Sequence, residues 1–356
     1  MNIKTMLKAF LLKFISKKKH LDFDIKLSKN VLIFRYDRIG DMIITTPVFR
    51  ELKAAYPNIE INVLASKANI LILKNNPNID NVYLNNKNNL LFDLPILLKL
   101  RKQKIDTCIE FDHSVIRHAI FRLKIINPKK IISVKKNGRY GLKGNEIELY
   151  DFYTEKKENT HFRDIWLETL KPFNINPKNN SYEIFFDEED KERAIKFVNQ
   201  FSNKLLIGIN LEGAVKGKKI RFEELKDICK GLYKLNNNIQ IIILFSPDKE
   251  EKIKHNILNL NLAFVTKSYT TNTINSVAAL IKNLDIIITP DTSISHIAST
   301  FNKPVITIHE NNENSYNLFA PTSDLNRTIF SNSKNSLDGY SVLAVLNAAD
   351  ELIKSM

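Results

Sequence analysis

The strongest chemical signal in the sequence is a run of hydroxyl, acidic and imidazole side chains after an apolar segment, within Asp285 to Thr300. The apolar run DIIIT predicts a buried strand ending at Thr289, and TSISHIAST predicts a helix that starts at once. Backbone N–H groups at a helix start lack partners and bind phosphate well. Asp291, Thr292 and Ser293 can cap this start, and His296 lies one turn further on, within reach of a sugar or phosphate. An ordinary capped strand-to-helix junction has the same pattern.

A second signal is the segment RYDRIGDMIITTP, Arg35 to Pro47, which follows another strand-like run. Gly40 allows a tight turn, and Asp41 then lies at the carboxyl end of the strand. A carboxylate at this place can accept a proton from a hydroxyl group, and Arg35 and Arg38 can attract an anion. From spacing alone, a helix-capping role for Asp41 is favoured, and the arginines can be surface charges.

Positive charge gathers in a third segment, Asn210 to Leu225. A strand ends in a loop that contains Gly213 and Gly217, and the cations of this loop are Lys216, Lys218 and Lys219. Such cations can neutralise the charge that grows on a departing diphosphate. A solvated basic loop has the same composition.

A fourth group of polar residues follows the strand-like run DTCIEFD in the first half of the chain. Asp112 and His113 lie at its carboxyl end, Arg117 and Arg122 come next, and a basic stretch runs from Lys129 to Lys143. This composition suits a surface that contacts an anionic substrate, although a solvated basic face is an equal alternative for any single residue.

The elements that position these residues alternate regularly between strand and helix. In the first half, strands are predicted at 31–36, 59–66, 82–86 and 106–112, and helices at 70–77, 94–104 and 161–173. A further helix ends near Pro57, with Pro47 in its first turn and Thr45 or Thr46 as its cap. The second half repeats this order, with strands at 205–211, 239–246, 285–291 and 303–310, and helices at 188–201, 221–235, 274–283 and 292–300. The alternation predicts an α/β protein with two Rossmann-like, doubly wound domains facing a central cleft.

The predicted domain limits follow from linkers and composition. Residues 26–178 form the N-terminal domain and residues 179–335 the C-terminal domain, joined by a Pro- and Asn-containing linker. Residues 336–356 form a C-terminal helix that can pack back on the N-terminal domain. Residues 1–25 form a basic amphipathic helix whose apolar face is typical of a helix lying in a membrane interface, or of an ordinary helix packed on the domain.

Charge and cysteine content restrict the possible partners. The 356 residues carry a formal net charge of +14, which indicates an anionic partner: nucleic acid, an acidic membrane surface or a phosphorylated substrate. Cys108 and Cys229 fit neither a metal site nor a disulfide framework, which favours a cytoplasmic setting. No apolar run reaches the ~20 residues that span a bilayer. A nucleic-acid-binding protein is disfavoured, because the basic residues are spread along the chain without a recognisable binding motif.

Taken together, the motifs resemble glycosyltransferase family 9, typified by the heptosyltransferases that build the inner core of bacterial lipopolysaccharide. The resemblance covers about residues 30 to 310 and is carried by IFRYDRIGDMIITTPVFRELKAAYP and IITPDTSISHIASTFNKPVITI. It implies the GT-B fold and an inverting transfer of heptose from ADP-heptose, with no metal or other cofactor, to Kdo-lipid A or the heptosylated core. It also implies a cytoplasmic enzyme held peripherally on the inner membrane.

The resemblance also implies roles for individual residues. Asp41 falls on the catalytic base, and Lys216 best matches the lysine that stabilises the leaving phosphates, with Lys218 as a further candidate. Glu250 lies in the segment SPDKEEK, which resembles the family's segment near the ribose. The nucleotide sugar would otherwise be held by Asp291, Thr292, Ser293, Ile294 and His296. The acceptor is expected on the N-terminal domain, where position and charge rather than the family motif make Arg38, Gly40, His113 and Arg117 the candidate contacts.

The sequence departs from the family pattern at three places. Ser293 stands where the family usually has glycine, GKKIRF lacks the usual Lys-x-Trp-Pro, and Arg38 replaces a small or hydroxyl residue. A family 9 transferase with another nucleotide sugar, in lipooligosaccharide or capsule assembly, therefore stays open, as does a catalytically silent relative.

Overall fold

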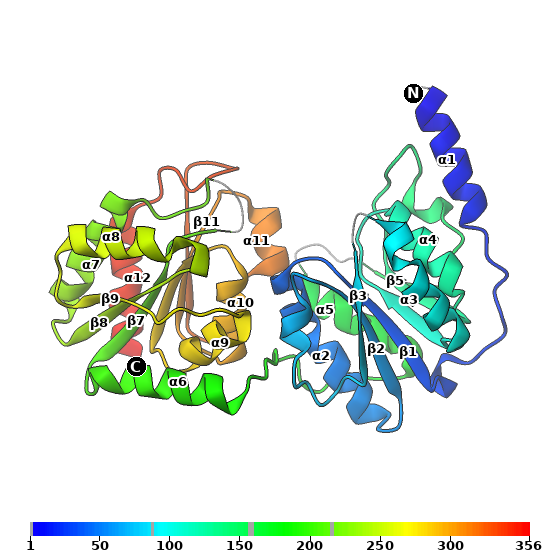
Figure 1. Cartoon of the computed structure of the whole chain (residues 1–356). Helices are drawn as coiled ribbons and strands as arrows, with labels where there is room; N and C mark the ends of the chain where they lie inside the picture. Colours follow the sequence, from blue (N-terminus) through cyan, green and yellow to red (C-terminus); the bar gives the residue numbers. More distant parts are fainter. Residues whose placement is uncertain (1–2, 87–88, 156–159, 214–216) are drawn as a thin grey trace. The chain divides into compact units, whose positions relative to one another are not determined.

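A computed structural model describes residues 3–86, 89–155, 160–213 and 217–356. The chain forms two compact units, Met1–Ser181 and Tyr182–Met356. The division lies a few residues beyond the predicted boundary, within the same linker. Each unit has its own parallel six-stranded sheet with helices on its faces (Figure 1). The α/β class and the two-domain organisation predicted from the alternating pattern are thus confirmed.

The first unit orders its strands β3-β2-β1-β4-β5-β6, all parallel. Its strands are β1 (Asn30–Arg35), β2 (Glu60–Ser66), β3 (Asn81–Asn85), β4 (Thr107–Glu110), β5 (Lys130–Val134) and β6 (Phe152–Thr154). Its helices are α1 (Ile3–Ile15), α2 (Ile39–Ala55), α3 (Leu90–Lys102), α4 (Arg117–Ile126) and α5 (Phe162–Leu167), with 3₁₀ turns η1 (Ile25–Leu27), η2 (Ile70–Leu73), η3 (Gly144–Glu146) and η4 (Glu168–Phe173).

The second unit has the order β12-β11-β10-β7-β8-β9, again all parallel. Its strands are β7 (Leu205–Asn210), β8 (Ile239–Leu244), β9 (Val265–Lys267), β10 (Ile286–Pro290), β11 (Val305–His309) and β12 (Asn326–Phe330). Its helices are α6 (Glu188–Val198), α7 (Phe222–Leu235), α8 (Glu250–Leu260), α9 (Ile274–Lys282), α10 (Ser293–Thr300), α11 (Glu313–Phe319) and α12 (Val342–Ser355), with 3₁₀ turns η5 (Asn199–Phe201) and η6 (Pro247–Lys249).

Read from β3 and from β9, the two sheets have the same order, in which the chain reverses direction across the sheet once. In the first unit the reversal lies between β1 and β4, and in the second between β7 and β10. Ligands of open α/β sheets bind beyond the carboxyl ends of the strands at such a switch point. All four polar segments singled out in the sequence follow one of these four strands.

Helix α2 differs from its predicted form, and the reason is local. It begins at Ile39, so Pro47 lies inside the helix, and Thr45 and Thr46 do not cap it. Proline lacks the N–H that would bond the carbonyl four residues earlier, here that of Ile43. The Thr46 hydroxyl donates to this carbonyl instead, at 2.7 Å, which lets the helix continue through the proline.

Other differences concern elements with weak local signals. The predicted helix at 70–77 is only the 3₁₀ turn η2, because Asn75 takes a positive φ of 58° and ends it. The basic stretch that begins at Lys129, for which no strand was predicted, contains β5. Helices α4, α8 and α11 and strands β6, β9 and β12 were not predicted.

The two terminal helices pack within single units. Helix α12 contacts α7, β11 and β12 and belongs to the second unit. Helix α1 packs on α4, where Ala9 and Leu12 join the core of the first unit. Within the described part of the chain, no helix combines the length and apolar character needed to cross a membrane.

Candidate functional site

At the switch point of the second unit, a network of side-chain hydrogen bonds fixes the start of α10. Thr292 is the N-cap, because its Oγ1 accepts from the N–H of Ile294 at 3.1 Å. Asn210, at the end of β7, donates from Nδ2 to Thr289 Oγ1 at 2.9 Å and so connects the ends of the two strands. Ser293 is the first residue of α10, at the positive end of the helix dipole. The arrangement suits an anionic ligand.

The loop after β7 places Lys218 beside this helix start. The Lys218 ammonium forms an ion pair with the Glu310 carboxylate and lies 3.6 Å from Asp291 Oδ2. Lys219 is exposed, and Lys216 lies outside the described residues. Of the candidate lysines that the structure describes, Lys218 is therefore the one brought to the Asp291 motif.

Two residues of this cluster were not singled out in the sequence. His309 is the last residue of β11 and Glu310 follows it, and His309 Nε2 lies 3.4 Å from Asp291 Oδ2. A histidine and a glutamate directly after the apolar run VITI were the available signal. Asp291, His309 and Glu310 offer ligand atoms within 4.8 Å of one another, a spacing that suits a cation. The Lys218 ammonium already supplies positive charge to both carboxylates, so the cluster is a lysine-neutralised acidic pair.

His296 and Glu250 occupy different surroundings in the same unit. His296 is buried, and its ring meets that of Tyr182 edge-on, with centroids 6.3 Å apart. Glu250 begins α8 and accepts from Lys267 Nζ and Thr270 Oγ1, both at 2.7 Å. These hydrogen bonds lower the pKa of Glu250, which keeps it an acceptor for hydroxyl groups.

In the first unit, Asp41 lies in the first turn of α2, just beyond the carboxyl end of β1. Its Oδ2 accepts from the N–H of Arg38 at 3.2 Å, so it does cap the helix. Its Oδ1 lies 3.4 Å from Arg35 Nη2, and the side chain keeps 15 % exposure. Capping therefore leaves a carboxylate oxygen at the switch point. Gly40 is helical, and Arg38 is exposed.

Arg35 has a structural role rather than the anion-attracting role considered from the sequence. Its side chain is only 3 % exposed and pairs with both Asp37 and Asp41. The guanidinium also stacks on the ring of Trp166, 3.8 Å from its centroid. These contacts fix the Arg35 guanidinium, which in turn fixes the position of the Asp41 carboxylate.

A cluster of buried charged side chains lies at the carboxyl end of β4, the strand that pairs with β1. The Glu110 carboxylate binds the Lys136 ammonium and accepts from the N–H of Asp112 at 2.7 Å. Burial alone would raise the pKa of Glu110, but Lys136 and these hydrogen bonds lower it. Burial raises the pKa of Asp112 well above its ordinary value, and the charges of Glu110 and Asp37 add to this effect. Lys136 therefore belongs to the interior, although the sequence placed it in a basic surface stretch.

The remaining acceptor candidates divide into exposed and buried residues. His113 Nε2 accepts from Trp166 Nε1 at 3.0 Å, and its ring lies 4.1 Å from that of Phe162. Arg117 is exposed at the first turn of α4. Arg122 is fully buried and pairs with Asp93 at 2.6 Å, so it contributes nothing to an anion-binding surface.

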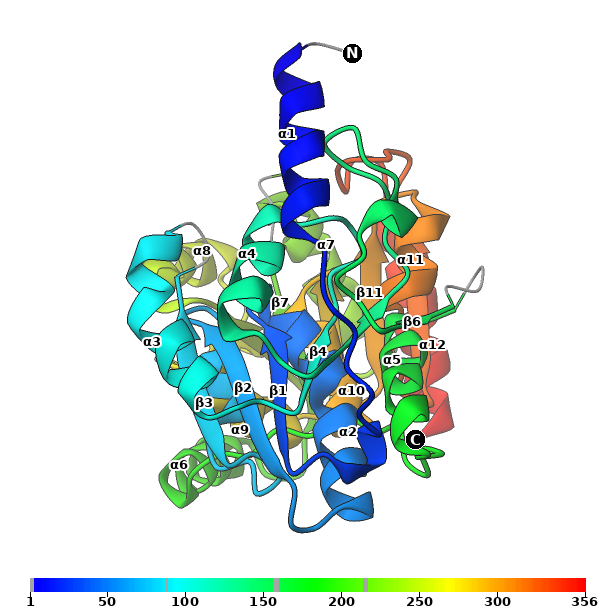
Figure 2. The same ribbon diagram turned by 90° about the vertical axis from the view of Figure 1, so that its right-hand side faces the viewer.

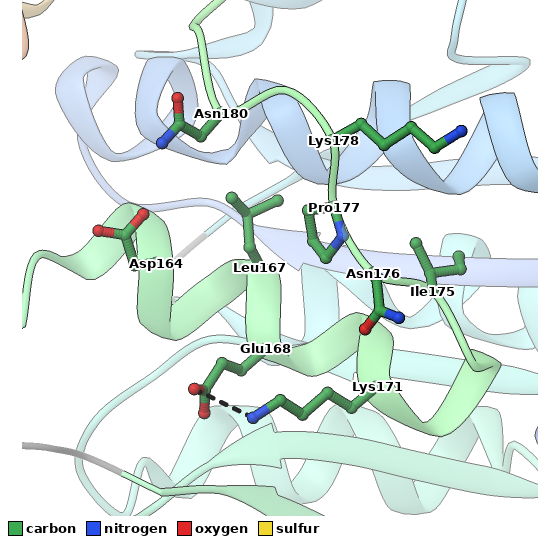
Figure 3. Close-up of a pocket in the computed structure, with 9 residues that line it drawn as sticks. All are labelled: Asp164, Leu167, Glu168, Lys171, Ile175, Asn176, Pro177, Lys178 and Asn180. Carbon is green, nitrogen blue, oxygen red and sulfur yellow. Dashed lines mark ion pairs between the residues drawn. The ribbon is translucent and has the colours of Figure 1, made fainter.

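The structure also has a pocket of about 330 Å³ in the first unit, away from the residues above (Figure 3). It lies between the α5–η4 segment and the chain that follows, and the Glu168–Lys171 ion pair, at 3.1 Å, lies along one side. None of the predicted site residues lines it. Its lining residues are Asp164, Leu167, Glu168, Lys171, Ile175, Asn176, Pro177, Lys178 and Asn180.

Comparisons with known proteins identify the family of the chain. Residues 98–338 match the model of glycosyltransferase family 9 (heptosyltransferase). The lipopolysaccharide core heptosyltransferase OpsX of Haemophilus influenzae is 23 % identical over 283 residues, 79 % of each chain. A putative lipopolysaccharide heptosyltransferase 4 of Escherichia coli is 24 % identical over 292 residues, 79 % of this chain and 74 % of its own.

Solved structures show the same fold. A family 9 glycosyltransferase from Veillonella parvula superposes with a TM-score of 0.76 at 16 % identity, covering 94 % of this chain and 99 % of its own. The E. coli ADP-heptose lipopolysaccharide heptosyltransferase II superposes with a TM-score of 0.70 at 17 % identity, covering 92 % and 99 %.

Proposed function

The chain belongs to glycosyltransferase family 9, and from this premise we propose that it transfers heptose from ADP-heptose to the inner core of lipopolysaccharide. The observation that carries the proposal is the placement of the motifs. Asp41 lies at the switch point of the first sheet, and Thr292, Asp291 and Lys218 gather at that of the second. Glycosyl transfer needs a base that deprotonates the acceptor hydroxyl and a group that stabilises the leaving diphosphate of the donor, and these two places can supply them.

Asp41 acts in this proposal as the general base. It takes the proton from the acceptor hydroxyl as that oxygen attacks the anomeric carbon, and the bond to the nucleotide diphosphate breaks on the opposite face, so the configuration inverts. The exposed part of its carboxylate and the support of Arg35 fit this role. Arg38, Gly40, His113 and Arg117 are the candidate acceptor contacts.

The leaving diphosphate gains negative charge in the transition state. Lys218 and the backbone N–H groups at the start of α10 are suited to stabilise that charge without a metal ion. Ser293, Ile294 and His296 complete the candidate donor contacts, with Glu250 toward the ribose. Lys216, the other candidate for this role, lies outside the described residues.

The acceptor of such a reaction is anchored in a membrane by its lipid part. We therefore place the enzyme at the cytoplasmic face of the inner membrane, associated peripherally. The basic net charge of +14 supports this placement, because that surface is anionic.

The test is turnover with ADP-heptose, UDP-sugars and GDP-sugars, each with deacylated Kdo-lipid A as acceptor, measured with and without EDTA. We expect transfer from ADP-heptose that persists in EDTA. Asp41→Asn should lower kcat by about 10²–10⁴-fold, because the amide cannot accept the proton. Asp190→Asn is the matched control, since Asp190 is also an acid in the first turn of a helix, α6, and should keep full activity.

Each outcome has a distinct meaning. Turnover of another nucleotide sugar would overturn the donor and keep the chemistry. Full activity of Asp41→Asn would overturn the base. A chelator-sensitive rate would overturn the metal-free stabilisation of the diphosphate.

A further inference from the structure

Helix α1 presents a row of large apolar side chains to solvent although its opposite side is anchored. Ala9, Leu12 and Ser16 are buried on the first unit. The exposed residues keep between 53 and 72 % of their surface: Met6, Leu7, Phe10, Leu11 and Phe14. Exposed apolar patches of this kind mark interaction sites, since a soluble surface gains nothing from them.

Helix α3 carries a second exposed apolar group. Leu91 and Phe92, in its first turn, are 81 % and 74 % exposed. Both α1 and α3 pack on α4, and Figures 1 and 2 show all three helices in the same part of the first unit, with α1 projecting beyond α4. The first turn of α3 follows β3, so it lies at the carboxyl edge of the sheet, as Asp41 does.

The charges carried by α1, α3 and α4 are mostly positive, and an acid beside α1, Glu146, pairs with Lys13 at 3.3 Å. Residues 3–20 contain no Asp or Glu, and the single acid of α3 and α4 is Asp93, which is buried against Arg122. The exposed cations of α1, of the chain that follows it and of the first turn of α4 include Lys8, Lys17, Lys19 and Arg117.

We propose that this surface, called the docking face, binds a bilayer of anionic phospholipids. The apolar side chains of α1 and α3 enter the boundary between headgroups and acyl chains, and the surrounding cations contact the lipid phosphates. The charge decides between possible occupants: a second copy would bring an equally basic face and be repelled, whereas an anionic membrane is attracted.

Helix α1 is held firmly enough to act as an anchor. Lys18 Nζ pairs with Asp151 at 2.6 Å and donates to the Lys129 carbonyl at 3.0 Å, and Lys124 Nζ donates to the Lys17 carbonyl at 2.7 Å. Lipid contact at α1 is therefore transmitted to the body of the unit. The proposal rests on the proposed function only in that a lipid-borne acceptor is what such docking would bring to Asp41.

The test is flotation of the full chain with vesicles of phosphatidylcholine, with or without phosphatidylglycerol. We expect binding only with phosphatidylglycerol, weakening as salt is added. Phe10→Ser/Phe14→Ser should lower the bound fraction about ten-fold or more, and Leu91→Ser/Phe92→Ser should lower it as well. Leu258→Ser/Leu343→Ser is the matched control, because both leucines are similarly exposed but lie in the second unit.

A second readout separates this proposal from the proposed function. The Phe10→Ser/Phe14→Ser variant should keep its rate on deacylated acceptor and lose rate on acceptor embedded in vesicles. If the parent protein transferred heptose to neither acceptor but still bound vesicles, the proposed function would be wrong and the docking face would remain supported. Unchanged flotation of the variants, or a shift from dimer to monomer in their sedimentation without loss of flotation, would overturn the docking face.

Discussion

The residues with the most consequence for stability are the charged side chains that the fold has taken out of water. Glu110 and Lys136 are both essentially unexposed and pair with one another at the end of β4. Removing one partner of a buried pair costs far more than the pair itself contributes, because the remaining charge has no compensation. The carboxyl end of β4 therefore depends on a lysine that comes from the chain after β5.

We expect Lys136→Met to lower the free energy of unfolding by about 3–5 kcal/mol. The double variant Glu110→Gln/Lys136→Met should recover most of this loss, and urea denaturation measures both. The neighbouring Lys135→Met is the control, because Lys135 pairs with Glu155 in an exposed position and its loss should change stability by less than about 1 kcal/mol. Equal effects of the two lysine variants would contradict the buried-pair account.

At the scale of elements, most helices are held by their apolar faces, but α1 relies also on charge. Asp151, which precedes β6, joins Lys18, His20 and the N–H of Ile131, at 2.6, 2.7 and 2.8 Å. Burial alone would raise the pKa of Asp151, but its hydrogen bonds to Lys18, His20 and Ile131 outweigh burial and lower it. The segment that carries α1 is thus tied to the sheet edge by an ionised carboxylate.

The Asp151 contacts make the free energy of unfolding decrease as the pH falls. Because the pKa of Asp151 is lowered on folding, its stabilisation is complete above the ordinary aspartate value of about 4 and is lost as pH falls through the lower folded value. Asp151→Asn should cost roughly 1–3 kcal/mol at pH 7, and the difference from the parent should shrink on acidification. Urea denaturation across this pH range measures it. Asp248→Asn is the control, because it removes an exposed partner of Lys249. Its free energy of unfolding should stay close to that of the parent across this pH range.

At the scale of the whole molecule, two sheets of the same order have separate cores. Ile207, Ile241 and Ile288 belong to the core of the second unit, and Leu32, Cys108 and Ile131 to a core cluster of the first. Each switch point is therefore built from residues of one unit. A ligand bound at one of them stabilises that unit by mass action.

Hydrogen exchange with ADP tests this division. We expect the strongest protection in the second unit, at the end of β7, the start of α8 and the start of α10. Thr292→Ala should weaken this protection and lower stability by about 1 kcal/mol through loss of the cap. Ser341→Ala, which removes the cap of α12, should cost similar stability and leave the ADP response intact. Dominant protection in the first unit would instead argue against the donor site.

The sequence by itself determined the α/β class, the two domains and the motifs at four strand ends, because apolar runs and helix-start residues act over a few neighbours. The tertiary structure alone decided which charges meet. Lys218 rather than Lys219 reaches Asp291 because Glu310, 92 residues further along the chain, binds its ammonium. Arg35, Arg122 and Lys136 are interior because Asp41, Asp93 and Glu110 compensate them. Such pairings depend on contacts between distant segments, which local patterns do not encode.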